Sequence, residues 1–133
     1  MHNYKELKIW QKGRLIVKEI YSITNLFPKE EQFGLISQMR RAVISIPSNI
    51  AEGAGRGSNK EFSRFLDISN GSAFELEAQL FLSYDLKYIS KKIFYDKLEK
   101  VQEIQKMIYH FKNSITKSWY LCLISWYKID NKM

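Results

Sequence analysis

The sequence contains little cysteine, proline or glycine: these residues number one, two and six among 133. The lone cysteine, Cys122, cannot form an internal disulfide, so a hydrophobic core has to hold the fold together. A hydrophobic content of 45% is enough for one such core in a single domain of this length. The N-terminal stretch MHNYKELKIW contains no uninterrupted apolar segment of the secretory kind, and we therefore expect a protein of the reducing cytoplasm.

Long hydrophobic runs are missing as well. The longest near-continuous apolar run, WYLCLISWY, extends from Trp119 to Tyr127. A membrane-spanning helix needs ~20 apolar residues, so this run is far too short to cross a bilayer. We expect no membrane partner.

Residue patterns that support catalysis or metal binding are also absent from the sequence. The two histidines, His2 and His110, are far apart and have no metal-ligand spacing. Ser45 and Ser48 have no histidine or lysine nearby in the sequence to act as a base, and Cys122 has no evident activator. The sequence therefore predicts no enzyme activity, no metal and no cofactor.

Apolar residues at helical spacing are abundant. Steps of three and four predict four helices, over residues 4–25, 28–54, 60–87 and from 91 onward. Three short connections favour antiparallel neighbours, so we expect an all-α, up-down-up-down four-helix bundle. The chain then forms one domain over residues 1–133, in which residues 113–133 either extend the fourth helix or form a tail.

Several residues predict where the helices begin and end. Pro28 suits the first turn of the second helix, and the glycines within residues 53–57 can end that helix by taking positive φ. Ser58 has the capping-box spacing to Glu61 at the start of the third helix, and Ser90 is a candidate cap for the fourth.

Pro47 lies inside the second predicted helix. It removes the hydrogen bond to the carbonyl of Val43 and crowds that turn, so we expect a kink there. The nearby hydroxyls of Ser45 and Ser48 could satisfy the freed backbone carbonyls.

Aromatic residues continue beyond what one bundle requires. Phe74, Phe81 and Tyr88 are each seven residues apart, which indicates either a wide edge of the core or a surface buried against another subunit. Trp119 and Trp126 continue the apolar stripe of the fourth helix past the predicted end of the bundle. We expect a homo-oligomer with these five residues as interface candidates. The segment with the two tryptophans should pack on a neighbouring subunit or fold back, and a disordered tail is the alternative.

The net charge is +7, from 21 basic and 14 acidic residues, and it makes an anionic partner plausible. Residues 1–27 carry five basic and two acidic groups, and residues 90–133 carry nine and four. Lys92, Lys100 and Lys106 have acids three or four residues away, which partly neutralise them. The candidates for nucleic-acid binding are the unpaired stripe Lys5, Lys8 and Lys12, together with Arg41 and Arg56. For any single lysine, a solvated face is the simpler interpretation.

The segment FPKEEQFGLISQMRRAVISIPSNIAEGAGRGSNKEFSRFL, continued by NGSAFELEAQL, resembles a known family. This is the four-helix bundle family named for proteins encoded in intervening sequences of the large-subunit ribosomal RNA gene. The same family contains relatives of the accessory variability protein of diversity-generating retroelements. The likeness extends from about Tyr4 to Phe111. It implies a four-helix bundle, a homopentamer, and a suspected role in binding RNA or reverse transcriptase.

The resemblance carries over a set of polar and small residues without settling their biochemical roles. They are Gln38, Arg41, Ser45, Pro47, Asn49, Ile50, Ala51, Glu52, Gly53, Gly71, Ser72, Glu75 and Leu76. Ser69 and Asn70 depart from the family pattern, where a more apolar pair is expected. The leading hypothesis is a non-enzymatic, oligomeric adaptor that binds RNA or a nucleoprotein. The alternative is a protein-interaction scaffold that does not bind nucleic acid.

Overall fold

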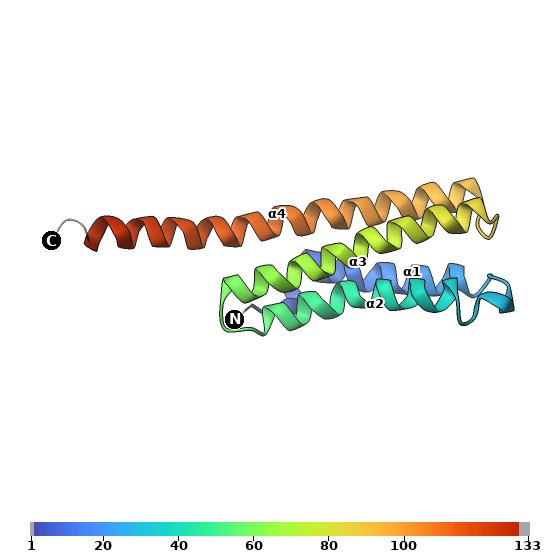
Figure 1. Ribbon diagram of the computed structural model, residues 1–133, viewed down its shortest axis with the longest axis horizontal. Helices are drawn as coiled ribbons and strands as arrows, with labels where there is room; N and C mark the ends of the chain where they lie inside the picture. The colour runs from blue at the N-terminus through green and yellow to red at the C-terminus, as the bar shows by residue number, and fades with distance from the viewer. Residues whose placement is uncertain (1, 131–133) are drawn as a thin grey trace.

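The computed structural model describes the backbone of residues 2–130 and the side chains of residues 2–117. The described backbone contains four α-helices, two short 3₁₀ helices and no strand (Figure 1). In chain order they are η1 (Tyr4–Glu6), α1 (Lys8–Thr24), η2 (Lys29–Glu31), α2 (Leu35–Ala54), α3 (Asn59–Asp85) and α4 (Lys91–Asp130). The predicted all-α fold is confirmed.

Short turns connect the helices, which run up, down, up and down as a bundle. The pairing of α2 with α3 is the most extensive, and the pairing of α1 with α4 is the least. The 40 residues of α4 make a helix about 60 Å long at ~1.5 Å per residue. Its C-terminal part therefore extends past the ends of the other three helices (Figure 1).

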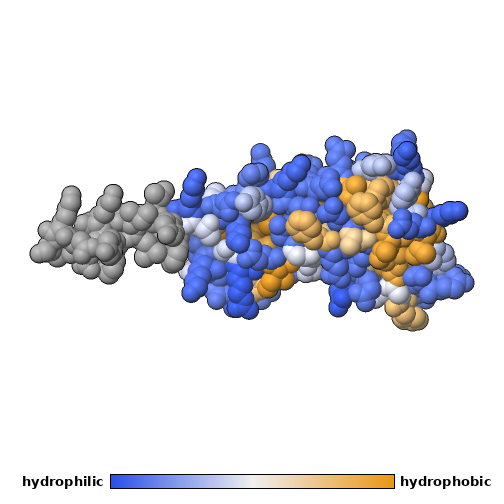
Figure 2. Space-filling model, turned by 45° about the horizontal axis from the view of Figure 1, so that its top comes forward, coloured by the Kyte–Doolittle hydropathy of each residue, from blue (hydrophilic) through white to orange (hydrophobic). Residues whose placement is uncertain are grey.

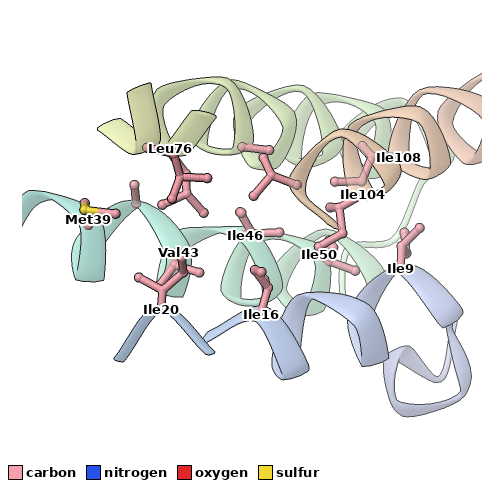
Figure 3. Close-up of a cluster of buried hydrophobic side chains, with 14 of the residues drawn as sticks. Ile9, Ile16, Ile20, Met39, Val43, Ile46, Ile50, Leu76, Ile104 and Ile108 are labelled. Carbon is pink, nitrogen blue, oxygen red and sulfur yellow. The ribbon is translucent and has the colours of Figure 1, made fainter. Parts of the chain in front are cut away.

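The core is built mainly from isoleucine and leucine, and all four helices contribute to it. Figure 3 shows Ile16 and Ile20 of α1 facing Val43 and Ile46 of α2. Side chains that are almost completely buried come from every helix: Ile16, Ile20, Met39, Val43, Ile46, Ile50, Phe62, Leu66, Leu76, Leu80, Ile104 and Ile108. A bundle of this size is thus held together by burial of aliphatic side chains.

Two predicted helix caps are confirmed. The backbone N–H of Glu61 donates to Ser58 Oγ at 3.2 Å, and the N–H of Ile93 donates to Ser90 Oγ at 3.2 Å. The predicted start of the second helix at Pro28 is wrong. Residues 29–31 form only the 3₁₀ turn η2, and α2 begins at Leu35, whose N–H donates to Glu31 Oε2 at 2.8 Å.

The second helix ends at Ala54 as predicted, but its glycines do not end it by taking a positive φ. All six glycines lie in the described part of the chain, and none has a positive φ. Gly55 ends the helix at φ −81°, with its N–H directed to the carbonyls of Ala51 and Glu52. Gly53 is needed for a different reason. A Cβ atom there would lie 2.7 Å from Phe65 Cβ and 2.9 Å from an edge carbon of Phe62, so its small size lets α2 approach α3 closely.

Ser45, close to Pro47, bonds to side chains rather than to a freed backbone carbonyl. α2 remains helical through Pro47. Ser45 Oγ accepts from Ser72 Oγ on α3 at 2.8 Å and from Asn49 Nδ2 at 2.8 Å. The hydroxyl of Ser69 donates to the carbonyl of Ile46 at 2.8 Å. Side chains around this turn therefore connect the two helices instead of repairing the backbone near the proline.

The placement of Tyr88 in line with Phe81 on the third helix is wrong. α3 ends at Asp85, and Lys87 takes a left-handed conformation with φ 63°. The N–H of Tyr88 then donates to the carbonyl of Ser83 at 2.9 Å, which closes the helix end. Because the chain reverses its direction here, Tyr88 cannot continue a stripe along α3.

The three aromatic residues consequently have different environments. The ring of Tyr88 packs on Phe27, with the centroids 5.2 Å apart. The ring of Phe81 packs edge to face on Phe94 of α4, at 4.9 Å, and its side chain is still 46% exposed. Phe74 is 56% exposed. Phe74 and Phe81 are thus the two residues of this set that offer apolar surface along α3.

Replacement of Gly53 by alanine should destabilise the bundle, because the added methyl group would overlap the Cβ of Phe65 and the ring of Phe62 on α3. Overpacking of this kind costs about 1–3 kcal/mol. The matched control is Gly71→Ala within α3, where no atom lies within 4 Å of the new Cβ. There the higher helix propensity of alanine should stabilise by about 0.5–1 kcal/mol. Urea unfolding measures the change in the free energy of unfolding for both variants. If both variants were stabilised or both destabilised, the close approach of α2 to α3 at Gly53 would be contradicted.

Candidate nucleic-acid interface

Arg41 lies on the exposed side of α2 and Arg56 in the turn that follows this helix, and each is held by an acidic side chain. Arg41 donates to Gln38 Oε1 at 2.7 Å and lies 3.8 Å from Glu75 of α3. Arg56 pairs with Glu52 at 3.0 Å. All of these groups are well exposed, and exposed ion pairs contribute little stability. Either guanidinium could therefore exchange its partner for a phosphate at low cost.

The lysine stripe predicted on the first helix is not continuous. Lys5 lies in η1, and Leu7 between η1 and α1 is extended, so Lys5 does not share a helix with Lys8 and Lys12. Lys12 is also not unpaired, because its Nζ lies 3.2 Å from Glu103 of α4. Lys5 and Lys8 are exposed, as expected. The sequence could not reveal the pairing of Lys12 because its partner lies on the last helix.

The contact between α1 and α4 is strongly electrostatic. Glu19 of α1 accepts from Lys97 at 3.0 Å and also from Lys100, both on α4. Lys100 in addition lies 3.5 Å from Asp96, as its spacing in the sequence suggested. Burial alone would raise the pKa of Glu19, but hydrogen bonds from the two lysines outweigh this effect and lower it. The carboxylate thus stays ionised and ties the two helices together.

Other basic residues along α1 and α4 keep their charge available. Among the side chains of residues 2–117, no ion pair involves Lys8, Lys18 or Lys106, and all three are exposed. Lys106 was expected to be partly neutralised by a neighbouring acid, but Glu103 pairs with Lys12. We call Lys8, Lys18 and Lys106 the basic seam. Of these three residues, Lys18 lines a groove of about 500 Å³ between α1 and α4.

A smaller hollow of about 250 Å³ lies where α2 turns into α3. Its lining residues are His2, Arg56, Gly57, Ser58, Asn59 and Phe62. The imidazole of His2 packs on the ring of Phe62, with centroids 5.1 Å apart. Arg56 is therefore close to the N-terminus of α3, which carries a partial positive charge.

The described residues show no arrangement suited to metal chemistry. Among them, no group of three or more His, Cys, Asp or Glu side chains could hold a metal ion. In the same part of the chain, no helix combines the length and the apolar character needed to cross a bilayer.

Comparison with known proteins places this bundle in a family. The profile of the 23S rRNA-intervening sequence protein family matches residues 5–110. The chain belongs to this family. A crystal structure of a protein of unknown function from the S23 ribosomal protein family of Bacteroides thetaiotaomicron is similar, with a TM-score of 0.73 and 24% identity over 78% of this chain and 97% of that chain. This likeness shows the shared fold. No curated protein matches the sequence.

The polar residues that the family resemblance carries over lie along the junction of α2 and α3. Gln38, Arg41 and Glu75 form one connected group there, and Ser45, Asn49 and Ser72 form a second. Glu52 and Gly53 lie closer to the turn between the helices. Ser45 and Ser72 of this set therefore link α2 to α3, and Arg41 is its basic member at the surface. The side chains of Trp119 and Trp126 lie outside those that the structure describes.

Replacement of Glu19 by glutamine should destabilise the bundle at neutral pH by about 0.5–1 kcal/mol, since its partners are partly exposed. The pKa of Glu19 is lowered in the folded state, so its contribution is complete above the ordinary value of 4.5 and is lost as the pH falls below that value. The difference in unfolding free energy between variant and wild type should therefore become smaller as the pH falls below 4.5.

Urea unfolding at a series of pH values measures this difference. The control is Glu99→Gln, which removes an exposed carboxylate of α4 that has no ion pair among the described side chains. A stability difference for Glu19→Gln that does not change with pH would contradict the assigned role.

Proposed function

We propose that this protein is a non-enzymatic adaptor that binds RNA through the basic seam on α1 and α4. The observation that carries the proposal is the group of exposed lysines, Lys8, Lys18 and Lys106, which have no ion pair among the described side chains. Membership of the 23S rRNA-intervening sequence protein family and the net charge of +7 support it. Lys5 and the arginines Arg41 and Arg56 are secondary candidates.

Recognition of this kind depends on phosphate charge. Lysine presents a compact ammonium on a flexible stem, which reads the charge of a phosphate rather than the edge of a base. The seam should accordingly bind RNA with little sequence preference and with strong dependence on salt. The ion pairs across α1 and α4 hold the two helices in register, and the unpaired lysines remain on the outside.

Self-association would strengthen such binding. The family resemblance extends the proposal to a homopentamer, in which each copy contributes one seam and the contacts act together. It also makes a reverse transcriptase bound to RNA a candidate partner. A scaffold that contacts only proteins is the competing function, and binding of RNA distinguishes the two.

The double variant Lys8→Gln/Lys106→Gln should bind RNA more weakly than the wild type. Each lysine that contacts a phosphate of a single strand contributes ~0.7 to the slope of log affinity against log salt, so the slope should fall by about 1.4. Fluorescence anisotropy with a labelled single-stranded RNA at several salt concentrations measures affinity and slope together.

Lys29→Gln/Lys60→Gln provides a control of equal charge, because both lysines are exposed and lie away from the seam. This control should lose much less affinity and keep most of the slope. Equal losses in the two double variants would mean that net charge alone attracts RNA. If the wild type binds no RNA even at low salt, the scaffold function is favoured.

A further inference from the structure

A pocket of about 350 Å³ opens between α1 and α2, toward the end of the bundle where α2 turns into α3. Residues of η1, α1 and α2 line it, and we call it the aromatic pocket. Its lining includes Tyr4, Trp10, Arg14, Ile44, Pro47 and Ser48. Sites for small ligands typically have volumes of ~300–1,000 Å³, so the aromatic pocket has room for a group the size of one nucleotide.

Two aromatic rings that contact each other line the aromatic pocket. The rings of Tyr4 and Trp10 meet edge to face, with their centroids 5.1 Å apart. Both side chains are half-buried and pack against the hydrophobic core, which holds the rings in place. An aromatic surface that is already fixed loses little conformational entropy when a flat ring stacks on it. The two rings therefore suit a planar ligand.

Positive charge lies beside these rings. The guanidinium carbon of Arg14 lies 5.6 Å from the centre of the Trp10 ring, and Lys5 Nζ lies 5.9 Å from the centre of the Tyr4 ring. Both cations are exposed, and neither forms an ion pair with the side chains of residues 2–117. Among the same residues, no acid lines the pocket. An anionic group beside the rings would thus meet cations and no competing carboxylate.

The aromatic pocket adjoins the basic seam. Lys18 follows Arg14 by four residues on α1, and residues at this spacing are neighbours on the surface of a helix. Because both side chains are exposed, a chain of phosphates that passes over α1 can contact them in turn. Cations that follow a phosphate backbone and an aromatic ring on which a base stacks are the two parts of a site for single-stranded nucleic acid.

Two other grooves lack this combination in the described part of the chain. The groove between α1 and α4 contains Glu19 and Glu103 beside its lysines, and no aromatic residue lines it. A groove of about 370 Å³ between α2 and α3 lies at the end that carries η2 and the turn between α3 and α4, where exposed apolar residues gather (Figure 2). It is lined by Asp85 and by Gln79, whose Oε1 has no hydrogen-bond partner, and by no cation. A base with its phosphate therefore fits the aromatic pocket better than either groove.

We propose that the aromatic pocket holds one base of a single-stranded RNA, stacked on the indole ring of Trp10. This inference rests on the proposed RNA binding and adds to it the type of strand and the position of one nucleotide. Arg14 turns from the ring to the phosphate of that nucleotide, and Lys18 contacts the next phosphate. Ser48 is exposed and lines the pocket, so its hydroxyl is available to the edge of the base. Duplex RNA cannot enter in this way, because its bases are already stacked on both faces.

Removing the bases from the RNA tests the stacking directly. Oligouridine and an oligomer of the same length without bases carry the same number of phosphates, so contacts to phosphate alone would bind both alike. The wild type should bind oligouridine about tenfold more tightly, because stacking of a base on an aromatic ring contributes about that much affinity. Trp10→Leu keeps an apolar side chain against the core and should bind the two oligomers equally. Fluorescence anisotropy measures the affinities.

The matched control is Tyr88→Leu. It removes another half-buried aromatic ring that packs against the core, and it leaves the aromatic pocket and the basic seam intact. This variant should keep the preference for oligouridine. Arg14→Gln should also keep it, whereas the slope of log affinity against log salt should fall by ~0.7 because one phosphate contact is lost. Circular dichroism confirms that all variants fold.

The fluorescence of Trp10 reports the stacking itself. In the variant Trp119→Phe/Trp126→Phe, Trp10 is the only tryptophan. A base that stacks on the indole should quench its fluorescence as oligouridine is added. The oligomer without bases should leave the fluorescence unchanged, because it contacts only the cations around the ring.

Other outcomes would overturn the inference. If the wild type binds both oligomers equally, the pocket holds no base, and RNA binding through the basic seam still stands. If uridine monophosphate quenches Trp10 at the same concentration as oligouridine, the pocket is a site for a free nucleotide. Quenching by a proline-rich peptide but not by oligouridine would identify a protein as the partner. A wild type that binds neither oligomer at low salt contradicts this inference and the proposed function together.

Discussion

The close approach of α2 and α3 is the constraint on which the rest of the structure depends. Gly53 permits it, because any side chain there would collide with Phe62 or Phe65. Once the helices are this close, the hydroxyls of Ser69 and Ser72 reach α2 and form hydrogen bonds that a wider spacing would break. Polar residues that the family resemblance carries over therefore lie where these two helices pair, and the other two helices pack on that pair.

The opposite side of the bundle follows a different principle. α1 and α4 make the least extensive helix pairing, and ion pairs such as Lys12 with Glu103 and Glu19 with Lys97 connect them. Partly exposed ion pairs are weaker than packed apolar side chains, so this side keeps an open groove and a charged border. Stability and function therefore depend on different parts of the bundle. The closely packed pair α2 and α3 stabilises the fold, and the less tightly packed pair α1 and α4 presents the charges that the proposed RNA binding uses.

The two ends of the molecule differ as well. One end exposes apolar residues and a groove with an unpaired acceptor, and the other carries an overhang of α4 with no described helix beside it. The two ends of the bundle therefore present different surfaces. In an assembly that joins one end of a copy to the other end of the next, the outer lysines would recur at regular intervals.

The sequence by itself determined the four helices, their core faces and the caps at Ser58 and Ser90, because periodicity and capping depend on residues within one or two turns. It also carried the family signature. Only the tertiary structure decided why Gly53 is glycine, that Lys12 is paired, and that Gln79 buries an unpaired oxygen. Each of these facts depends on whether a group of another helix lies close by. Spacing along the chain contains no information about how far apart two helices lie.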